Sequence, residues 1–186
     1  MNFIQAVKTC TKCGLHATRT NVVIGDGPVP ASLVFLGEAP GKLEDLKGVP
    51  FVGTAGSYLR TLITLIKAEK KSFHILNVLK CRPPENRDPL PEELLACRPF
   101  LEHQLKVIKP KVIIAMGRYA QAFVLGKDPK DVKTTENAGE IFPWNEEETL
   151  ALLTYHPAFV LRKRNTEIEK AFRKHLSKGI RLAYGK

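Results

Sequence analysis

The sequence has 186 residues, with 29 Lys and Arg against 19 Asp and Glu, and 44% of its residues are hydrophobic. This length fits one domain with its own core, and we expect a single domain over residues 1–186. No apolar run is long enough to cross a bilayer and no signal peptide is evident, so we expect a soluble, intracellular protein without membrane contacts. In that reducing compartment, the four cysteines are not expected to form structural disulfides.

The positive charge is concentrated near the C-terminus. Residues 162–186 contain nine Lys and Arg but only two acids, so they carry seven of the ten net positive charges. A basic face of this kind is typical of a protein that binds a polyanion, most simply a nucleic acid. A basic helix that is merely solvated explains the charge equally well.

Short apolar runs alternate with segments of helical periodicity along the chain. The runs at 33–36, 75–79, 112–116 and 150–155 are rich in Val, Ile and Leu and predict buried strands. Apolar spacing predicts helices around 59–66, 91–108 and 119–125, and a last amphipathic helix over 168–180. We expect Thr54 to cap the first helix and Pro99 to kink or split the second.

This alternation predicts an α/β fold with a mainly parallel central sheet. Residues 141–144 are the expected exception, because they are placed to form a hairpin with the strand at 150–155. Functional sites in open α/β sheets gather at the carboxyl ends of the strands. The residues that follow each strand are therefore the first candidates for a site.

Two motifs lie between the first two predicted strands. A turn of Gly, Ala and Pro holds Glu38 directly after the first strand, where a carboxylate can position water or act as a base. Further on, small residues that include Gly53 let main-chain N–H groups approach a phosphate, and Phe51 can present a flat face to a base. An ordinary turn, a core Phe and a routine helix start are the alternatives.

Two more candidates lie in or after later strands. Asn77 is a polar amide inside an apolar strand, and it either reads the edge of a base or satisfies the backbone. His156 follows the last strand, where it can stabilise developing negative charge or simply cap a helix. Shortly after it, Leu161 and Arg162 combine apolar and basic side chains, as a wedge between base pairs would.

The four cysteines follow one pattern. Cys10 and Cys13 form a C-x2-C pair, and Cys81 and Cys97 follow after intervals of 67 and 15 residues. A C-x2-C pair places two thiolates on one metal or cluster, and four thiolates suit either structural zinc or a [4Fe–4S] cluster. Spacing does not choose between them. Free structural thiols are the remaining alternative.

The separate motifs form an ordered set. In chain order they are Cys10-x2-Cys13, Gly37-Glu38-Ala39-Pro40-Gly41, Pro50-Phe51-Val52-Gly53, Asn77 with Lys80-Cys81-Arg82-Pro83-Pro84, Cys97, and His156-Pro157-Ala158. This set spans residues from about 7 to about 175 and resembles the family 4 uracil-DNA glycosylases, the iron–sulfur enzymes of many bacteria and archaea.

The resemblance implies a three-layer α/β/α sandwich with a four-stranded, mainly parallel central sheet. It also implies a structural [4Fe–4S] cluster held by Cys10, Cys13, Cys81 and Cys97. The catalytic residues that it implies are Glu38 and His156, with support from Glu44 and Asn86. The base-binding residues are Ala39, Gly41, Phe51 and Asn77. We expect DNA contacts at Gly53, Thr54, Leu161, Arg162, Lys163 and Arg164.

The function that follows is a monofunctional uracil-DNA glycosylase. Such an enzyme flips uracil out of DNA and hydrolyses its N-glycosidic bond, which leaves an abasic site for base excision repair. We expect a cytoplasmic, nucleoid-associated monomer that binds uracil-containing DNA, with a sliding clamp as a further candidate partner. Three alternatives stay open: a glycosylase for another deaminated base such as hypoxanthine, a non-catalytic metal-stapled nucleic-acid-binding module, and an α/β protein with a zinc knot.

Overall fold

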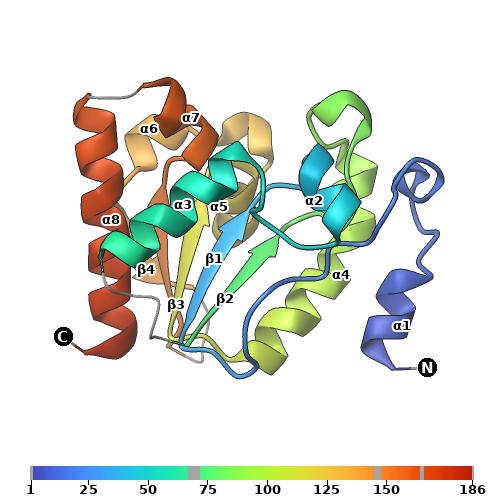
Figure 1. Ribbon diagram of the computed structural model, residues 1–186. Helices are drawn as coiled ribbons and strands as arrows, with labels where there is room; N and C mark the ends of the chain where they lie inside the picture. The colour runs from blue at the N-terminus through green and yellow to red at the C-terminus, as the bar shows by residue number, and fades with distance from the viewer. Residues whose placement is uncertain (1, 67–71, 145–147, 164–165, 186) are drawn as a thin grey trace.

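The computed structural model describes residues 2–66, 72–144, 148–163 and 166–185. Within these ranges one five-stranded sheet has the order β2-β1-β3-β5-β4 (Figure 1). The strands β1 (Leu33–Gly37), β2 (Phe73–Asn77), β3 (Val112–Met116) and β5 (Leu150–Thr154) are parallel. The short edge strand β4 (Ile141–Pro143) is antiparallel to β5, which confirms the expected hairpin and adds a fifth strand to the four that the resemblance implied.

Helices cover both faces of the sheet. The main ones are α3 (Thr54–Leu65), α4 (Pro91–Ile108), α5 (Arg118–Leu125) and α8 (Glu167–Tyr184). Shorter helices are α1 (Phe3–Lys8), α2 (Lys42–Lys47), α6 (Thr134–Asn137) and α7 (Pro157–Arg162). The four helices predicted from periodicity are all present. Among the described residues, no helix is long and apolar enough to cross a membrane.

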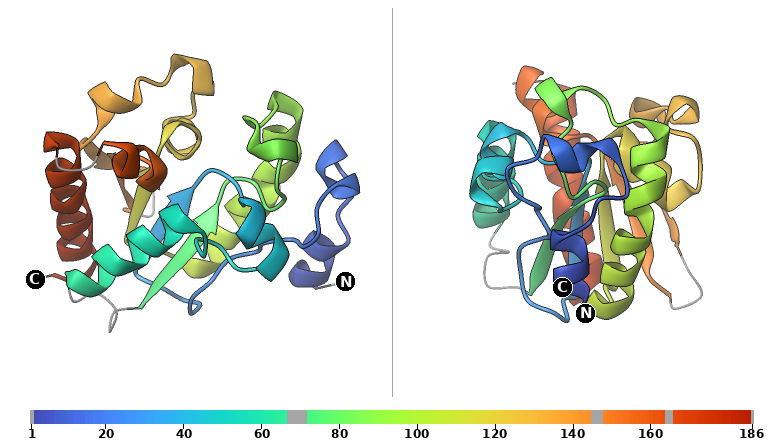
Figure 2. Two further views of the ribbon diagram at one scale, coloured as in Figure 1. Left: turned by 45° about the horizontal axis from the view of Figure 1, so that its top comes forward. Right: turned by 90° about the vertical axis from the view of Figure 1, so that its right-hand side faces the viewer.

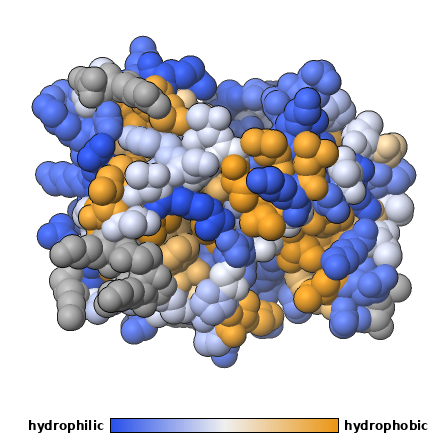
Figure 3. All heavy atoms as spheres, viewed as in Figure 1, coloured by the Kyte–Doolittle hydropathy of each residue, from blue (hydrophilic) through white to orange (hydrophobic). Residues whose placement is uncertain are grey.

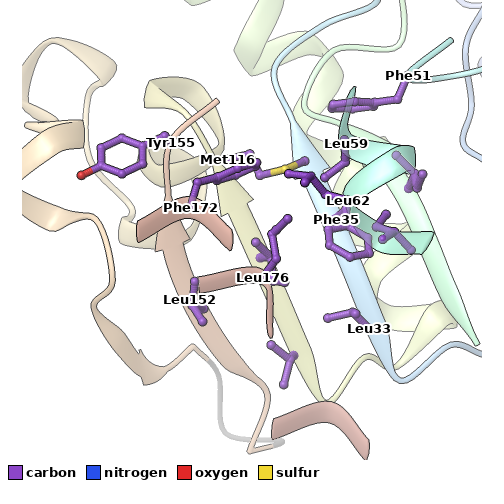
Figure 4. Packing of buried hydrophobic residues seen from close by; sticks show 14 of the residues in the cluster. Leu33, Phe35, Phe51, Leu59, Leu62, Met116, Leu152, Tyr155, Phe172 and Leu176 are labelled. Carbon is purple, nitrogen blue, oxygen red and sulfur yellow. The ribbon is translucent and has the colours of Figure 1, made fainter. Parts of the chain in front are cut away.

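Alternation along each strand divides the core into two layers. Leu33 and Phe35 of β1 pack with α3, α7 and α8, whereas Val34 and Leu36 pack with α4 and α5. This division follows from the two-residue repeat of a strand, because consecutive side chains point to opposite faces. In the first layer Phe51 lies at one end, beyond Leu59, and Leu33 lies toward the other (Figure 4). The three-layer prediction is confirmed.

Two details of the helices differ from expectation. Pro99 does not split α4, which runs unbroken from Pro91 to Ile108. The missing N–H of Pro99 deprives the carbonyl of Leu95 of its usual partner; Leu95 is 73% exposed, so water can reach that carbonyl. Thr54 is not the cap of α3 but its first residue, and Gly53 occupies the cap without a side-chain hydrogen bond.

The N-terminal segment runs along one side of the sheet, next to α4 and α2 (Figures 1 and 2). Phe3 of α1 stacks on His103 of α4 with ring centroids 4.3 Å apart. The buried carboxylate of Asp45 in α2 accepts from the N–H groups of Thr20 and Asn21, at 2.9 and 3.2 Å. These contacts bring the first two cysteines close to the other two.

The basic C-terminal segment forms α8 and packs against the sheet. Phe172 and Leu176 are fully buried, as the predicted apolar stripe requires. A β-carbon at Gly179 would lie 2.5 Å from Ile114 Cδ1, so glycine permits the close approach of α8 to β3. On the outer face Arg173 pairs with Glu169 at 2.8 Å, and most side chains along this edge of the molecule are hydrophilic (Figure 3).

Candidate active site

The predicted site residues meet at the carboxyl ends of the parallel strands. Gly37 at the end of β1 pairs with Asn77 at the end of β2. On the other side of β1, the N–H of Gly117 after β3 donates to the carbonyl of Thr154 at 2.9 Å, and His156 follows two residues later. Topology therefore brings together positions that are up to 119 residues apart in sequence.

Asn77 has a vacant acceptor. Its residue is 3% exposed, and its Oδ1 atom has no hydrogen-bond partner within the described part of the chain. A β-carbon at Gly37 would lie 2.5 Å from this Oδ1 and 2.5 Å from Phe51 Cζ, so glycine is required where the amide and the ring approach β1. A buried acceptor without a partner costs stability. Because it lies beside the ring of Phe51 at the end of β1, this acceptor is available to a ligand that donates a hydrogen bond.

Phe51 lies near this amide, in a turn where its own backbone is strained. Its φ of 55° lies in the left-handed region, which is unfavourable for a bulky residue. Arg60 of α3 donates from Nε to the carbonyl of Phe51 at 3.0 Å and from Nη2 to Asp26 at 2.6 Å. A β-carbon at Gly56 would lie 2.1 Å from the carbonyl carbon of Phe51, so only glycine fits there. These contacts fix the ring in the site.

Glu44 ties the Phe51 loop to the first turn. Its Oε1 accepts from the N–H groups of Val52 at 3.0 Å and Gly53 at 2.7 Å. A β-carbon at Gly41 would lie 2.8 Å from the other carboxylate oxygen. Glu44 thus connects the turn after β1 to the loop that holds Phe51. The N–H of Gly53 is engaged by this carboxylate, whereas Thr54 is exposed at the start of α3.

His156 caps the short helix α7. Its Nδ1 accepts from the N–H of Ala158 at 3.2 Å, so in the neutral ring the proton is on Nε2. Burial lowers the pKa of His156 to about 4, and the positive charge of Arg162 lowers it further while Glu44 opposes this. The ring centroid lies 6.2 Å from that of Phe51. The capping role and the role in the site are compatible, because they use different nitrogens.

Glu38 belongs to a charged group that sequence reasoning did not identify. Burial raises the pKa of Glu38 to about 7, Asp88 raises it further, and Arg118 opposes the rise. Arg118 is the first residue of α5, and its Nη2 lies 2.6 Å from Asp88 Oδ2. Gly117 and Arg118 directly follow β3. The strand-end rule applied to this third strand would have found both.

A β-carbon at Gly117 would lie 2.9 Å from His156 Cβ, and its φ of 84° also favours glycine. Gly117 therefore makes room for the histidine beside β3.

The remaining predicted residues lie at the margins of the site. Asn86 is exposed, and its Oδ1 accepts from Arg82 Nε at 2.8 Å within the loop after β2. Ala39 packs against the buried group of Leu15, Leu79, Cys81 and Cys97. Arg162 and Lys163 are exposed at the end of α7, with Leu161 half-buried beside them. Arg164 lies outside the described residues.

The four cysteines line one cavity, together with Leu15, Arg19, Lys80 and Phe100 among others. All four are free in the structure. Cys81 and Cys97 are buried, and Cys10 and Cys13 are partly exposed. The described side chains of His, Cys, Asp and Glu form no group that could hold a metal ion. Four sulfurs that line one cavity are the donor set of either a structural zinc ion or an iron–sulfur cluster.

Hydrogen-bond donors point at three of the sulfurs. The N–H of Lys80 donates to Cys97 Sγ at 3.3 Å, Arg19 Nη1 to Cys81 Sγ at 3.4 Å, and the N–H of Lys12 to Cys10 Sγ at 3.5 Å. Such donors stabilise thiolates and tune iron–sulfur clusters. Burial raises the pKa of Cys97 to about 11, so without a metal this sulfur would hold its proton. A bound metal would make it a thiolate.

The neighbouring Lys80 supports the same fit. It is 1% exposed, and burial lowers its pKa to about 8, an effect that Cys97 and Cys81 oppose. A buried ammonium requires compensating negative charge. Thiolates of a metal centre would supply it, and neutral thiols would not. The donor set and the charge therefore fit a cluster.

The comparisons with known proteins agree with this geometry. The model of the uracil DNA glycosylase superfamily matches residues 24–178. The chain belongs to this superfamily. A type-4 uracil-DNA glycosylase of Thermotoga maritima is 43% identical over 89% of this chain and 85% of the relative. One of Archaeoglobus fulgidus is 41% identical over 93% of this chain and 89% of the relative.

A second type within the superfamily is less similar. A type-5 uracil-DNA glycosylase of Thermus thermophilus is 31% identical over 63% of this chain and 68% of the relative. The type-4 relatives are thus matched over more of the chain and at higher identity, which confirms the resemblance drawn from the motifs. All the strand ends described above lie within the matched residues of this uracil DNA glycosylase superfamily member.

Proposed function

We propose that this protein excises uracil from DNA by hydrolysing its N-glycosidic bond, as a monofunctional glycosylase of base excision repair. Its membership of the superfamily and its similarity to type-4 enzymes support this function. The observation that carries the assignment of the base pocket is the vacant Oδ1 of Asn77, between the end of β1 and the ring of Phe51.

Asn77 would read the base. Its vacant Oδ1 would accept from N3–H of uracil, and its amide N–H would donate to O4. Cytosine presents the opposite groups at these positions, so one fixed amide discriminates against it, and each unmet bond costs about 1–3 kcal/mol. Phe51 would stack on the flipped base, a contact worth about 1–3 kcal/mol.

His156 would stabilise the leaving base. Bond cleavage produces an oxocarbenium-like sugar and a uracil anion with charge at O2. The tautomer set by Ala158 leaves Nε2–H free to donate to that oxygen, and the lowered pKa keeps the ring neutral. A donor that needs no reorganisation is most effective in such a role.

Glu38 would orient the water that attacks C1′ of the sugar. Its carboxylate also offsets the positive charge that develops there. Because its pKa is raised to about 7, Glu38 gains and loses its proton near neutral pH in the free protein. The Asp88–Arg118 pair adjusts this balance, because Asp88 raises the pKa and Arg118 lowers it.

The four cysteines would hold a structural [4Fe–4S] cluster. This centre would join the N-terminal segment to the loop after β2 and to α4. Arg162, Lys163 and the basic face of α8 would contact DNA phosphates, and Leu161 or Arg162 would fill the gap left by the flipped base. A monomeric state and a sliding-clamp partner remain predictions.

Excision assays test the function directly. The protein, checked for iron and sulfide, is incubated with oligonucleotides that contain uracil opposite G, uracil opposite A, or uracil in a single strand. Alkali-labile abasic sites are expected only where uracil was present. Hypoxanthine oligonucleotides provide the test for the alternative substrate. DNA binding without base release would instead support the non-catalytic module.

A further inference from the structure

Lys80 lies between the cysteine cavity and the base pocket. Its side chain is among the largest fully buried ones, with the residue 1% exposed. Its Nζ donates to the main-chain carbonyl of Asn77 at 2.6 Å, and its own N–H donates to Cys97 Sγ at 3.3 Å. One residue thus contacts both the proposed base reader and a proposed cluster ligand.

None of the ion pairs found among the described residues includes Lys80. Lysine is almost never fully buried unless it is paired. A buried ammonium at this place therefore indicates that the cysteine centre is anionic.

We propose that Lys80 is a positioning residue that couples the charge of the cysteine centre to the orientation of Asn77. The centre holds the ammonium in place, and the ammonium holds the carbonyl of Asn77. That carbonyl belongs to the residue whose vacant Oδ1 faces the base pocket. This role rests on the proposed function, because it assigns the reading of uracil to Asn77.

Lys80→Met removes the ammonium and keeps an unbranched, buried side chain. The inhibition constant of free uracil against excision is expected to rise about 10- to 100-fold, which is the usual effect of losing a group that orients a site residue. The reduction potential of the iron–sulfur centre is expected to fall, because a nearby positive charge favours the reduced form. A merely structural lysine would leave the inhibition constant of uracil unchanged in a variant with full iron content.

Gln104→Met is the matched control. Gln104 is also buried and long, and its Nε2 donates to a main-chain carbonyl, that of Ile24, at 2.8 Å, but it lies outside both sites. The same replacement there removes a comparable hydrogen bond. Uracil inhibition and the reduction potential are expected to stay at their wild-type values in this control.

A double-mutant cycle shows whether Lys80 acts through Asn77. In an Asn77→Ala background, Lys80→Met is expected to add little further loss of uracil binding, because the amide it positions is gone. Fully additive effects would overturn the proposal. So would an unchanged inhibition constant in the single variant with full iron content.

A measurement on the wild-type protein covers the case in which Lys80→Met does not fold. If Lys80 couples the two sites, uracil binding and reduction of the centre are linked, and the linkage acts in both directions. Saturating free uracil is expected to raise the reduction potential, and no shift would overturn the proposal. Loss of uracil excision by the wild-type protein would instead refute the proposed function itself.

Discussion

The base pocket and the cysteine cavity lie on either side of Lys80, but they differ in whether their polar atoms already have hydrogen-bond partners. In the base pocket a buried amide oxygen has no partner among the described residues. In the cavity, N–H groups already point at three of the four sulfurs. The first arrangement suits a ligand that enters and leaves, and the second suits a permanent centre. Damage to the pocket should therefore reduce activity, and damage to the cavity should reduce stability.

The largest expected effect is that of Cys97→Ser on stability. Cys97 is a buried ligand candidate, so its loss should release most of the iron and lower the free energy of unfolding by about 4 kcal/mol or more, as loss of a metal site does. Iron analysis and thermal unfolding measure both. If this variant has normal stability and iron content, the cavity is not a structural centre.

His156→Ala should have the opposite profile. Removing one donor to a developing anion typically slows the reaction about 10²- to 10³-fold. Single-turnover excision measures this loss, while iron content should remain that of the wild type. His103→Ala, which removes a ring stacked on Phe3 outside the pocket, is the control. Equal rates for both variants would exclude His156 from catalysis.

Glu38→Gln should slow excision about 10²-fold and change its pH dependence. The pKa of Glu38 is raised to about 7, so the required carboxylate is present above that pH and lost below it. The wild-type rate should therefore fall about tenfold per pH unit below pH 7. His156, with a pKa of about 4, contributes no further step above about pH 5.

Single-turnover rates from pH 5 to 9 give this profile. In Glu38→Gln the limb of the profile near pH 7, where the rate falls as the pH is lowered, should disappear. The control is Glu140→Gln, a change at an exposed carboxylate. A limb that persists in Glu38→Gln would assign the titration to another group.

The smallest effect is expected for Arg60→Lys. Lysine keeps the charge but not the planar fork that bonds the carbonyl of Phe51 and Asp26. The Phe51 turn should loosen, and KM for a uracil-containing oligonucleotide should rise about threefold, as expected for one weakened hydrogen bond. Steady-state kinetics beside Arg98→Lys, a surface control, measure the difference. An unchanged KM would mean that the contacts of Gly56 and Glu44 are enough to fix the turn.

Much of the fold follows from local pattern. Continuous apolar runs predicted the four parallel strands, because strands covered on both faces have few polar residues. The polar residues at their ends then indicated Glu38, Asn77 and His156. The split that we expected at Pro99 did not occur, because the cost of a proline inside a helix depends on whether water reaches the freed carbonyl of Leu95. That exposure is a property of the tertiary structure.

The supporting residues of the site were harder to predict. Arg60 had no role assigned to it from the sequence, because that role depends on where the Phe51 turn lies. Lys80 was part of the motif around Cys81 but had no role assigned to it. Its burial follows only when the N-terminal segment covers the loop after β2. Contacts between distant segments of the chain create these roles, so no local pattern encodes them.

The hydrogen bond between His156 and Ala158 makes the position of the imidazole proton depend on the first turn of α7. The ring donates from Nε2 only while the first turn of α7 is formed, because the N–H of Ala158 then occupies Nδ1. Fraying of this six-residue helix would free the imidazole to exchange tautomers. In the proposed mechanism, the direction of the His156 N–H dipole therefore depends on one short turn of helix. Heat or denaturant that melts this turn would remove the proposed donor before the sheet unfolds.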